Sequence, residues 1–98
     1  MANLGGVPES AVEKELVAIL GQHLAALRTA RGLTQEEVAL AAGISRQHYQ
    51  LLEIGLRARN PKKPANPTFS TLVALSEVLG TPLPILLDEV FSRAGSDA

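Results

Sequence analysis

Apolar side chains recur at intervals of three and four residues along the first third of the chain, which is the period of an amphipathic helix. Glu9 or Ser10 can open this helix, and Gly32 follows its last turn, where glycine commonly ends helices. Gly21 lies inside the pattern, where it either costs a continuous helix about 1 kcal/mol relative to alanine or separates two shorter helices. The apolar stripe consists of Val12, Leu16, Ile19, His23 and Leu27, widened by Val17, Leu20 and Leu24.

A capping box predicts where the second helix begins. Thr34 and Glu37 stand three residues apart in a T-x-x-E pattern, in which each side chain bonds to the other residue's backbone N–H. The helix is therefore expected to start at residue 35. Its apolar positions predict that Val38 and either Ala41 or Ala42 face inward.

A glycine and a serine predict a turn from this helix into a third one. Gly43 is placed to end the second helix with a positive φ, which costs glycine little. Ser45 is placed to cap the third helix. That helix is expected to run from about Arg46 to Ile54 and to stop near Gly55.

The rest of the chain predicts a loop and two more helices, with no strand. Residues 56–67 hold three prolines and two asparagines, which disfavour regular structure. Thr68 and Gly80 delimit a fourth helix, and Thr81 caps a fifth. The side chains expected to pack are Phe69, Leu72, Val73, Leu75, Val78 and Leu79 from the fourth helix, and Ile85, Leu86, Val90 and Phe91 from the fifth.

The length of 98 residues fits one small domain. We expect a disordered tail over residues 1–8, a single domain over residues 9–92 and a frayed tail over residues 93–98. Within the domain, residues 35–54 form the central motif and residues 55–67 a long basic loop.

Composition excludes several classes of protein. Without cysteine there is no disulfide framework and no cysteine metal site, and two histidines are too few for a histidine-only site. No nucleophile–base pair, carboxylate pair or phosphate loop is apparent, so neither an enzyme nor a cofactor is predicted. The absence of a signal sequence and of an apolar run near 20 residues predicts a cytoplasmic protein without a membrane partner.

The charge is distributed unevenly, although the net charge is only −1. Residues 28–63 carry seven Lys or Arg against three Glu, a net +4, while the segments before and after carry −2 and −3. Positive charge therefore gathers on and just after the central motif, where a polyanion would bind. The alternative is the uneven charge that is common in small proteins.

The motifs L-x-x-L-R, L-T-Q-E-E-V-A, A-G-I-S and L-E-x-G occur together at specific spacings. The segments LGQHLAALRTARGLTQEEVALAAGISRQHYQLLEIG and FSTLVALSEVLGTPLPILL resemble the Cro/repressor or XRE-like helix-turn-helix family over roughly residues 19–87. The resemblance implies an all-α, compact five-helix bundle that binds DNA, here with an added N-terminal helical segment. The chain departs from the family in this added segment, in a longer loop after Gly55, and in Tyr49, which takes a core position that is mostly Ile or Val in the family.

The family's docking mode implies that the start of the third helix reads bases in the major groove. Arg46, Gln47, Gln50 and Leu51 are then the base-contact candidates. Arginine can bind guanine and glutamine adenine with two hydrogen bonds, and a leucine can touch a thymine methyl group. The alternative is a solvated polar face, which is about as plausible for Gln50 and Leu51.

The phosphate-contact candidates lie at helix starts and in the basic loop. Gln35 resembles the family residue that holds a phosphate at the start of the second helix, where the helix dipole favours an anion. The full set is Thr34, Gln35, Ser45, His48, Arg57, Arg59, Lys62 and Lys63. The alternatives are capping alone for the threonine and serine, and a solvated charged loop for the basic residues.

Two further assignments concern the scaffold. Glu53 resembles the family carboxylate that pairs with an arginine on the first helix, here Arg28, as a structural ion pair. Ala39 is expected where the second and third helices approach closely. An ordinary helical hairpin would use the same small residues.

Together these features predict a sequence-specific transcriptional regulator, expected to be a repressor, that binds double-stranded DNA as a homodimer on a two-fold operator. The dimer surface is either the stripe from Val12 to Leu27 or the last helix with Leu83, Leu87 and Val90. The alternative is an antitoxin or interaction module of the same fold that does not read DNA. A protein partner such as a toxin or an anti-repressor is compatible with both.

Overall fold

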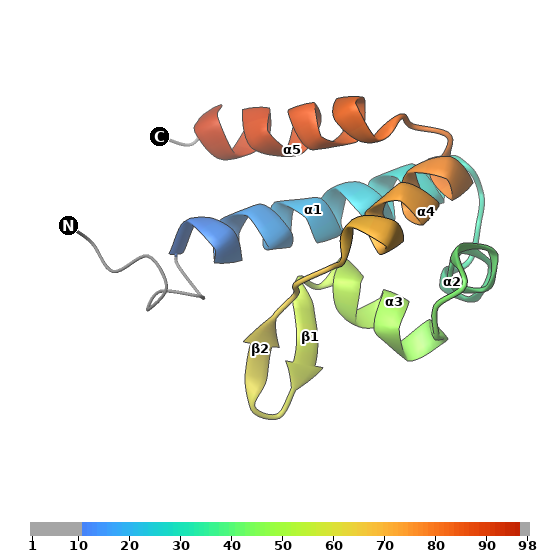
Figure 1. The fold of residues 1–98 in the computed structure, drawn as a ribbon, viewed down its shortest axis with the longest axis horizontal. Coiled ribbons are helices and arrows are strands. Elements are labelled where there is room, and N and C mark those ends of the chain that lie inside the picture. The colour runs from blue at the N-terminus through green and yellow to red at the C-terminus, as the bar shows by residue number, and fades with distance from the viewer. Residues whose placement is uncertain (1–10, 97–98) are drawn as a thin grey trace.

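The computed structural model of the chain describes residues 11–96, which form five helices and one two-stranded hairpin. Figure 1 shows α5 lying along α1 in the opposite direction, while α2 and α3 lie on the other side of α1. The predicted helical bundle is therefore confirmed. The elements are α1 (Ala11–Ala30), α2 (Gln35–Ala42), α3 (Arg46–Glu53), β1 (Leu56–Arg59), β2 (Lys62–Pro64), α4 (Phe69–Leu79) and α5 (Leu83–Ser96).

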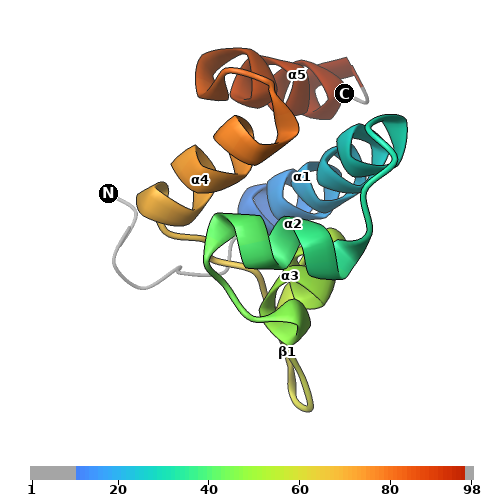
Figure 2. The same ribbon diagram turned by 90° about the vertical axis from the view of Figure 1, so that its right-hand side faces the viewer.

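The core draws on all five helices. Each contributes one apolar side chain that exposes none of its surface, namely Leu24, Val38, Tyr49, Leu75 and Leu86 in chain order. Figure 2 shows α1, α2, α3 and α4 gathered around this interior, with α5 closing it from above. Burial of this kind stabilises a fold by roughly 1.5–3 kcal/mol per large apolar side chain. The short helices α2 and α3 depend on it, because eight residues do not form a stable helix alone.

The first helix is continuous through Gly21, which settles the alternative left open by the sequence. The C-terminal end of α3 packs against α1 at this point. A Cβ atom on residue 21 would lie 2.6 Å from the carbonyl oxygen of Glu53 and closer still to that of Leu52. The glycine is therefore required by the close approach of two backbones rather than by a break in the helix.

The turn between α2 and α3 follows the predicted capping signals. Thr34 Oγ1 accepts a hydrogen bond from the backbone N–H of Glu37 at 3.0 Å, and the Glu37 side chain accepts one from the N–H of Thr34 at 2.8 Å. Gly43 adopts φ +75°, and Ser45 Oγ accepts a hydrogen bond from the N–H of His48 at 3.0 Å. Both ends of the turn are thus held by local bonds, and the prediction of this turn is confirmed.

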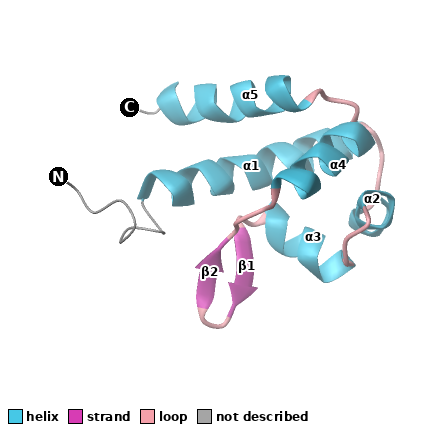
Figure 3. Cartoon of the chain, in the orientation of Figure 1, coloured by secondary structure: helices cyan, strands magenta, loops and turns pink. Residues whose placement is uncertain are grey.

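The prediction of an irregular loop over residues 56–67 was wrong for its first part. Residues Leu56–Arg59 and Lys62–Pro64 form an antiparallel hairpin, joined by a turn at Asn60 and Pro61 with a cis peptide bond between them (Figure 3). The prolines are compatible with this ribbon because they lie in its turn and at its end, where no strand N–H is required. The alternation of apolar and basic residues over Leu56–Arg59 is the sequence signal that could have revealed the strand, and the structure shows the matching alternation of half-buried and exposed positions.

The ends of the described chain differ from the sequence predictions in one respect. The helix α5 continues to Ser96, whereas fraying was predicted from residue 93. Ala94 packs against the core and Arg93 donates a hydrogen bond to Gln22 of α1, which hold this last turn in place. The tail predicted over residues 1–8 lies outside the described residues.

Some apolar side chains predicted to pack are exposed. Leu86 and Val90, four residues apart, take the inward face of α5, which leaves Ile85 and Phe91 on its flanks. Phe69, the first residue of α4, is exposed as well. Over residues 11–96 no single helix has the length and apolar character needed to cross a bilayer, although α4 and α5 together, bent by 101°, match a broken span in length and composition.

Candidate nucleic-acid interface

The N-terminal end of α3 is the exposed part of the motif. Arg46, Gln47 and His48 form the first turn of this helix, and all three are exposed. The opposite side of the helix is anchored by Tyr49 and Leu52 in the core. Arg46 and Gln47 therefore extend from a helix that is held in place by the core, and they remain accessible to a partner.

An open depression joins this end of α3 to the start of α2. Its lining includes Thr34 and Gln35 at the start of α2 and Arg46 at the start of α3. The first N–H groups of a helix have no partner within it and favour an anion. Glu36 adds a carboxylate to the same rim, which opposes that preference. The structure thus brings together a predicted base-contact residue and two predicted phosphate-contact residues.

The assignment of Leu51 to base contact requires correction. Its side chain is only 7% exposed and cannot touch a base from this position. The physical reason is that α3 contacts three other elements, α1, α2 and β1, and Leu51 lies on a buried part of the helix. Gln50 is half-buried.

Three helices are tied together by a network around Glu53. Arg28 donates from Nε to Glu53 Oε2 at 2.6 Å and from Nη2 to Oε1 at 3.2 Å, and its Nη1 donates to the carbonyl oxygen of Leu33 at 2.9 Å. Gln35 Nε2 also donates to Glu53 Oε1, at 2.7 Å. One N–H of the Gln35 side-chain amide is therefore used within the protein, and its backbone N–H, at the start of α2, is the group that we assign to a phosphate.

The network sets the ionisation of its members. Burial acts to raise the pKa of Glu53, but the hydrogen bonds from Arg28, with smaller effects of Tyr49 and Gln35, outweigh it and lower the pKa. The pKa of Arg28 is raised, mainly by its hydrogen bond to Glu53. Both groups are held in their charged forms, as a bidentate ion pair requires.

The hydroxyl group of Tyr49 reaches neither solvent nor a hydrogen-bond partner. The side chain is fully buried, and its hydroxyl lies near Glu53 but makes no hydrogen bond of ordinary geometry. Burial, followed by the nearby Glu53 carboxylate, raises the pKa of Tyr49. The ring fills the core position that the sequence predicted for it, at the cost of one unsatisfied polar atom.

The basic residues of the predicted loop lie on the hairpin. Arg57, Arg59 and Lys62 are exposed, and Lys63 is half-buried. Figures 1 and 2 show the hairpin projecting away from α1, α4 and α5 on the side of the molecule where α3 lies. The structure therefore places the hairpin and α3 on one face.

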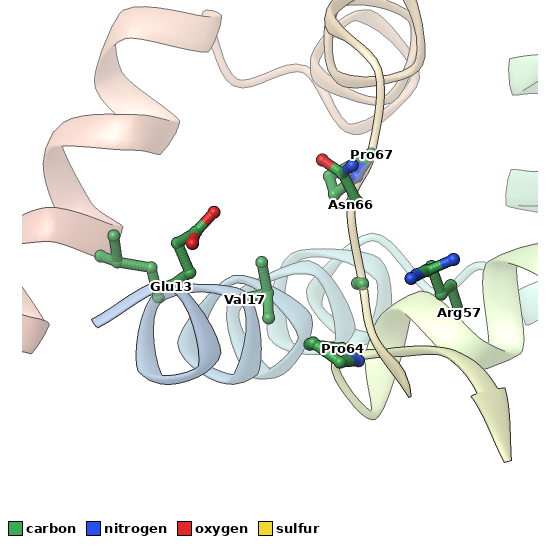
Figure 4. A pocket seen from close by; sticks show the side chains of 8 residues that line it. Glu13, Val17, Arg57, Pro64, Asn66 and Pro67 are labelled. Atoms are coloured by element: carbon green, nitrogen blue, oxygen red, sulfur yellow. The ribbon is translucent and has the colours of Figure 1, made fainter. Parts of the chain in front are cut away.

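A pocket of about 210 Å³ lies at the base of the hairpin, between α1 and the segment that follows β2 (Figure 4). Glu13 and Val17 line it from α1, and Arg57, Pro64 and Asn66 line it from the other side. Among the described residues, no three His, Asp or Glu side chains gather in a way that could hold a metal ion. The pocket lies on the helical segment that was predicted as an addition to the family pattern.

Comparison with known protein families matches most of the bundle to a family model. The family model described as helix-turn-helix matches residues 24–86, from the middle of α1 to the first turns of α5. An uncharacterized HTH-type transcriptional regulator of Sinorhizobium fredii, y4dJ, is 42% identical over 62 residues, which make up 63% of this chain and 70% of the relative.

Two solved structures share the fold. Both are crystal structures of the clp gene regulator ClgR from Corynebacterium glutamicum. One superposes with a TM-score of 0.67 at 23% identity, covering 92% of this chain and 83% of the other. The second has a TM-score of 0.63 at 29% identity, with coverage of 85% and 94%.

Proposed function

The chain belongs to the helix-turn-helix family, and from this premise we propose that it is a DNA-binding transcriptional regulator that inserts α3 into the major groove. The regulator name of the Sinorhizobium relative supports this proposal. The observation on which this proposal rests is the first turn of α3. Arg46 and Gln47 are exposed there, beside the start of α2, while the rest of the helix is held in the core.

The chemistry of the exposed turn fits base recognition. The guanidinium of Arg46 can donate to guanine O6 and N7, and the amide of Gln47 can bind adenine N6 and N7. Neither side chain forms a hydrogen bond or ion pair with another side chain in residues 11–96. We therefore assign base reading to these two residues, with Gln50 half-buried behind them.

Phosphate contacts complete the proposed docking. The start of α2 presents the backbone N–H of Gln35 and the hydroxyl of Thr34, while Ser45 and His48 lie exposed beside the start of α3. The basic side chains of the hairpin extend the positive surface away from this centre. Such contacts position the protein on the duplex without carrying sequence information.

We further propose that the protein represses transcription as a homodimer on a two-fold operator. One module of this size buries roughly 600–1,000 Å², less than specific DNA complexes of higher affinity. The stripe on α1 supplies the domain's own core through Ile19, Leu20 and Leu24, as does Val90 on α5. A dimer contact therefore uses side chains outside this set.

The test begins with selection of bound sequences from random duplex DNA by the purified protein, which reports the site, its symmetry and its half-site spacing. Arg46→Ala is expected to cost roughly 1–3 kcal/mol on the selected site and to relax preference at one base pair per half-site. Arg93→Ala is the matched control, because it removes the same charge on α5, far from α3.

Two results would overturn the proposal. One is a folded wild-type protein that binds no duplex at low ionic strength. The other is an Arg46→Ala protein whose affinity falls equally for the selected site and for unrelated DNA, since a loss of base reading must reduce the difference between them.

A further inference from the structure

The tip of the hairpin carries two cations directly opposite each other. Arg59 and Lys62 are cross-strand partners in the antiparallel register, immediately before and after the turn. Partners of this kind extend to the same side of a ribbon. Both side chains are exposed, so two positive charges are presented together at the outermost point of the hairpin.

This arrangement destabilises the hairpin itself. Like charges in directly opposed positions weaken a strand pair. Residues 56–64 contain four cations and no carboxylate, and within residues 11–96 no side chain forms an ion pair with Arg59 or Lys62. The described part of the chain thus offers nothing that compensates the repulsion, which makes an external polyanion the fitting partner.

The position of the hairpin selects which part of a duplex the tip can reach. β1 begins directly after α3, and the hairpin extends on the same face as that helix (Figures 1 and 3). Four strand residues span roughly 13 Å, which is about the width of a major groove (roughly 12 Å), so the tip can reach past the edge of the groove that α3 occupies. With α3 in a major groove, the tip extends toward the adjacent minor groove.

We propose that the hairpin tip inserts Arg59 into the minor groove that flanks the site read by α3, and that it thereby favours A·T pairs there. This inference rests on the proposed function. The narrow minor groove of A·T-rich DNA has an enhanced negative potential that attracts arginine. A guanidinium is also more weakly hydrated than an ammonium group, which favours Arg59 over Lys62 as the inserted side chain.

The exocyclic amino group of guanine provides the test. It lies in the minor groove, and replacing G·C by inosine·C removes it while leaving the major-groove pattern unchanged. The affinity of the wild-type protein is measured on the selected site with flanks of A·T, G·C or inosine·C pairs. We expect A·T and inosine·C flanks to bind about fivefold or more tightly than G·C flanks.

Three variants test whether the preference for A·T flanks comes from the hairpin tip. Arg59→Ala is expected to remove the flank preference and to lower the slope of log affinity against log salt by about 0.9, while discrimination within the site is kept. Arg46→Ala is expected to do the reverse, losing discrimination within the site and keeping the flank preference. Arg93→Ala should change neither, and thermal unfolding checks that each variant is folded.

The outcomes separate this inference from the function on which it rests. Equal affinity for all three flanks, with Arg59→Ala changing only the salt slope, would place the tip on phosphates and overturn the minor-groove assignment while leaving the regulator proposal standing. A wild-type protein that binds no duplex overturns both.

Discussion

For the substitution Gly21→Ala, helix propensity and packing predict opposite changes in the stability of the fold. In an isolated helix, alanine is more favourable than glycine by about 1 kcal/mol. In this fold, the added Cβ would lie 2.6 Å from the carbonyl oxygen of Glu53 and closer to that of Leu52. Both obstacles are backbone atoms at the end of α3, so the conflict is relieved only if α1 and α3 move apart.

The sizes of these two effects decide whether the substitution stabilises or destabilises the protein. Overpacking a core costs roughly 1–3 kcal/mol, and the upper end applies here because neither backbone can rotate away as a side chain would. Subtracting the propensity gain of about 1 kcal/mol leaves a net destabilisation of roughly 2 kcal/mol. For a domain of this size, that loss corresponds to a fall in Tm of roughly 8–16 °C.

The assay is thermal unfolding followed by circular dichroism, with Gly95→Ala as the matched control. Gly95 lies within α5, and a Cβ atom there meets nothing within 4 Å. The control is expected to be unchanged or stabilised by up to about 1 kcal/mol. If Gly21→Ala also raised the Tm, the two helices would not be in contact at this point, and the account of how α3 is positioned would fail.

Two further predictions concern the buried network. Glu53→Gln should cost roughly 3 kcal/mol at pH 7, because it leaves Arg28 without its charge partner. Since the pKa of Glu53 is lowered in the fold, the ion pair stabilises the fold fully above the unfolded pKa of about 4.3, and its contribution is lost as pH falls through the lower folded pKa. Urea unfolding should therefore show the difference in stability between variant and wild type shrinking as pH falls below that unfolded value. A difference in stability between the variant and the wild type that did not change with pH would contradict this. Tyr49→Phe should be neutral or stabilising by about 1 kcal/mol, because the hydroxyl it removes is buried without a hydrogen bond. The raised pKa of Tyr49 means that wild-type stability falls as pH rises above about 10, and the variant should lack this alkaline loss in the same titration.

The features that could be predicted from the sequence are those encoded within a few residues. The capping box of Thr34 and Glu37 and the positive φ of Gly43 depend only on neighbours three or four positions away. The Arg28–Glu53 ion pair joins residues 25 positions apart, and it was expected only because the chain resembles a known family. Local pattern therefore predicted the helices and their order, whereas the resemblance supplied the long-range pairing.

The features that were missed depend on a third partner or on two distant segments. Leu51 is buried on a helix that contacts α1, α2 and β1, and no pattern within α3 reveals which of its sides these elements cover. Gly21 is required by backbone atoms more than 30 positions away, so its spacing alone could not distinguish a helix break from a close approach. The hairpin was missed because its prolines outweighed a four-residue alternation, although they lie where a strand tolerates them.

One face of α1 fixes the position of α3 relative to the hairpin, the two elements that we propose contact DNA. Gly21 contacts the end of α3, and Gly55, at φ +76° between α3 and β1, lies so close to α1 that an added Cβ would be 3.0 Å from the Cα of Ala18. Arg28 binds Glu53 from the same side of α1, because residues 18, 21 and 28 lie within about 80° of one another at 100° per residue. Both the end of α3 and the start of the hairpin are therefore attached to a single rigid helix. If the tip reads a flanking minor groove, the distance between the bases read by α3 and the flank is then a fixed number of base pairs, and moving the A·T flank by half a helical turn must abolish its effect.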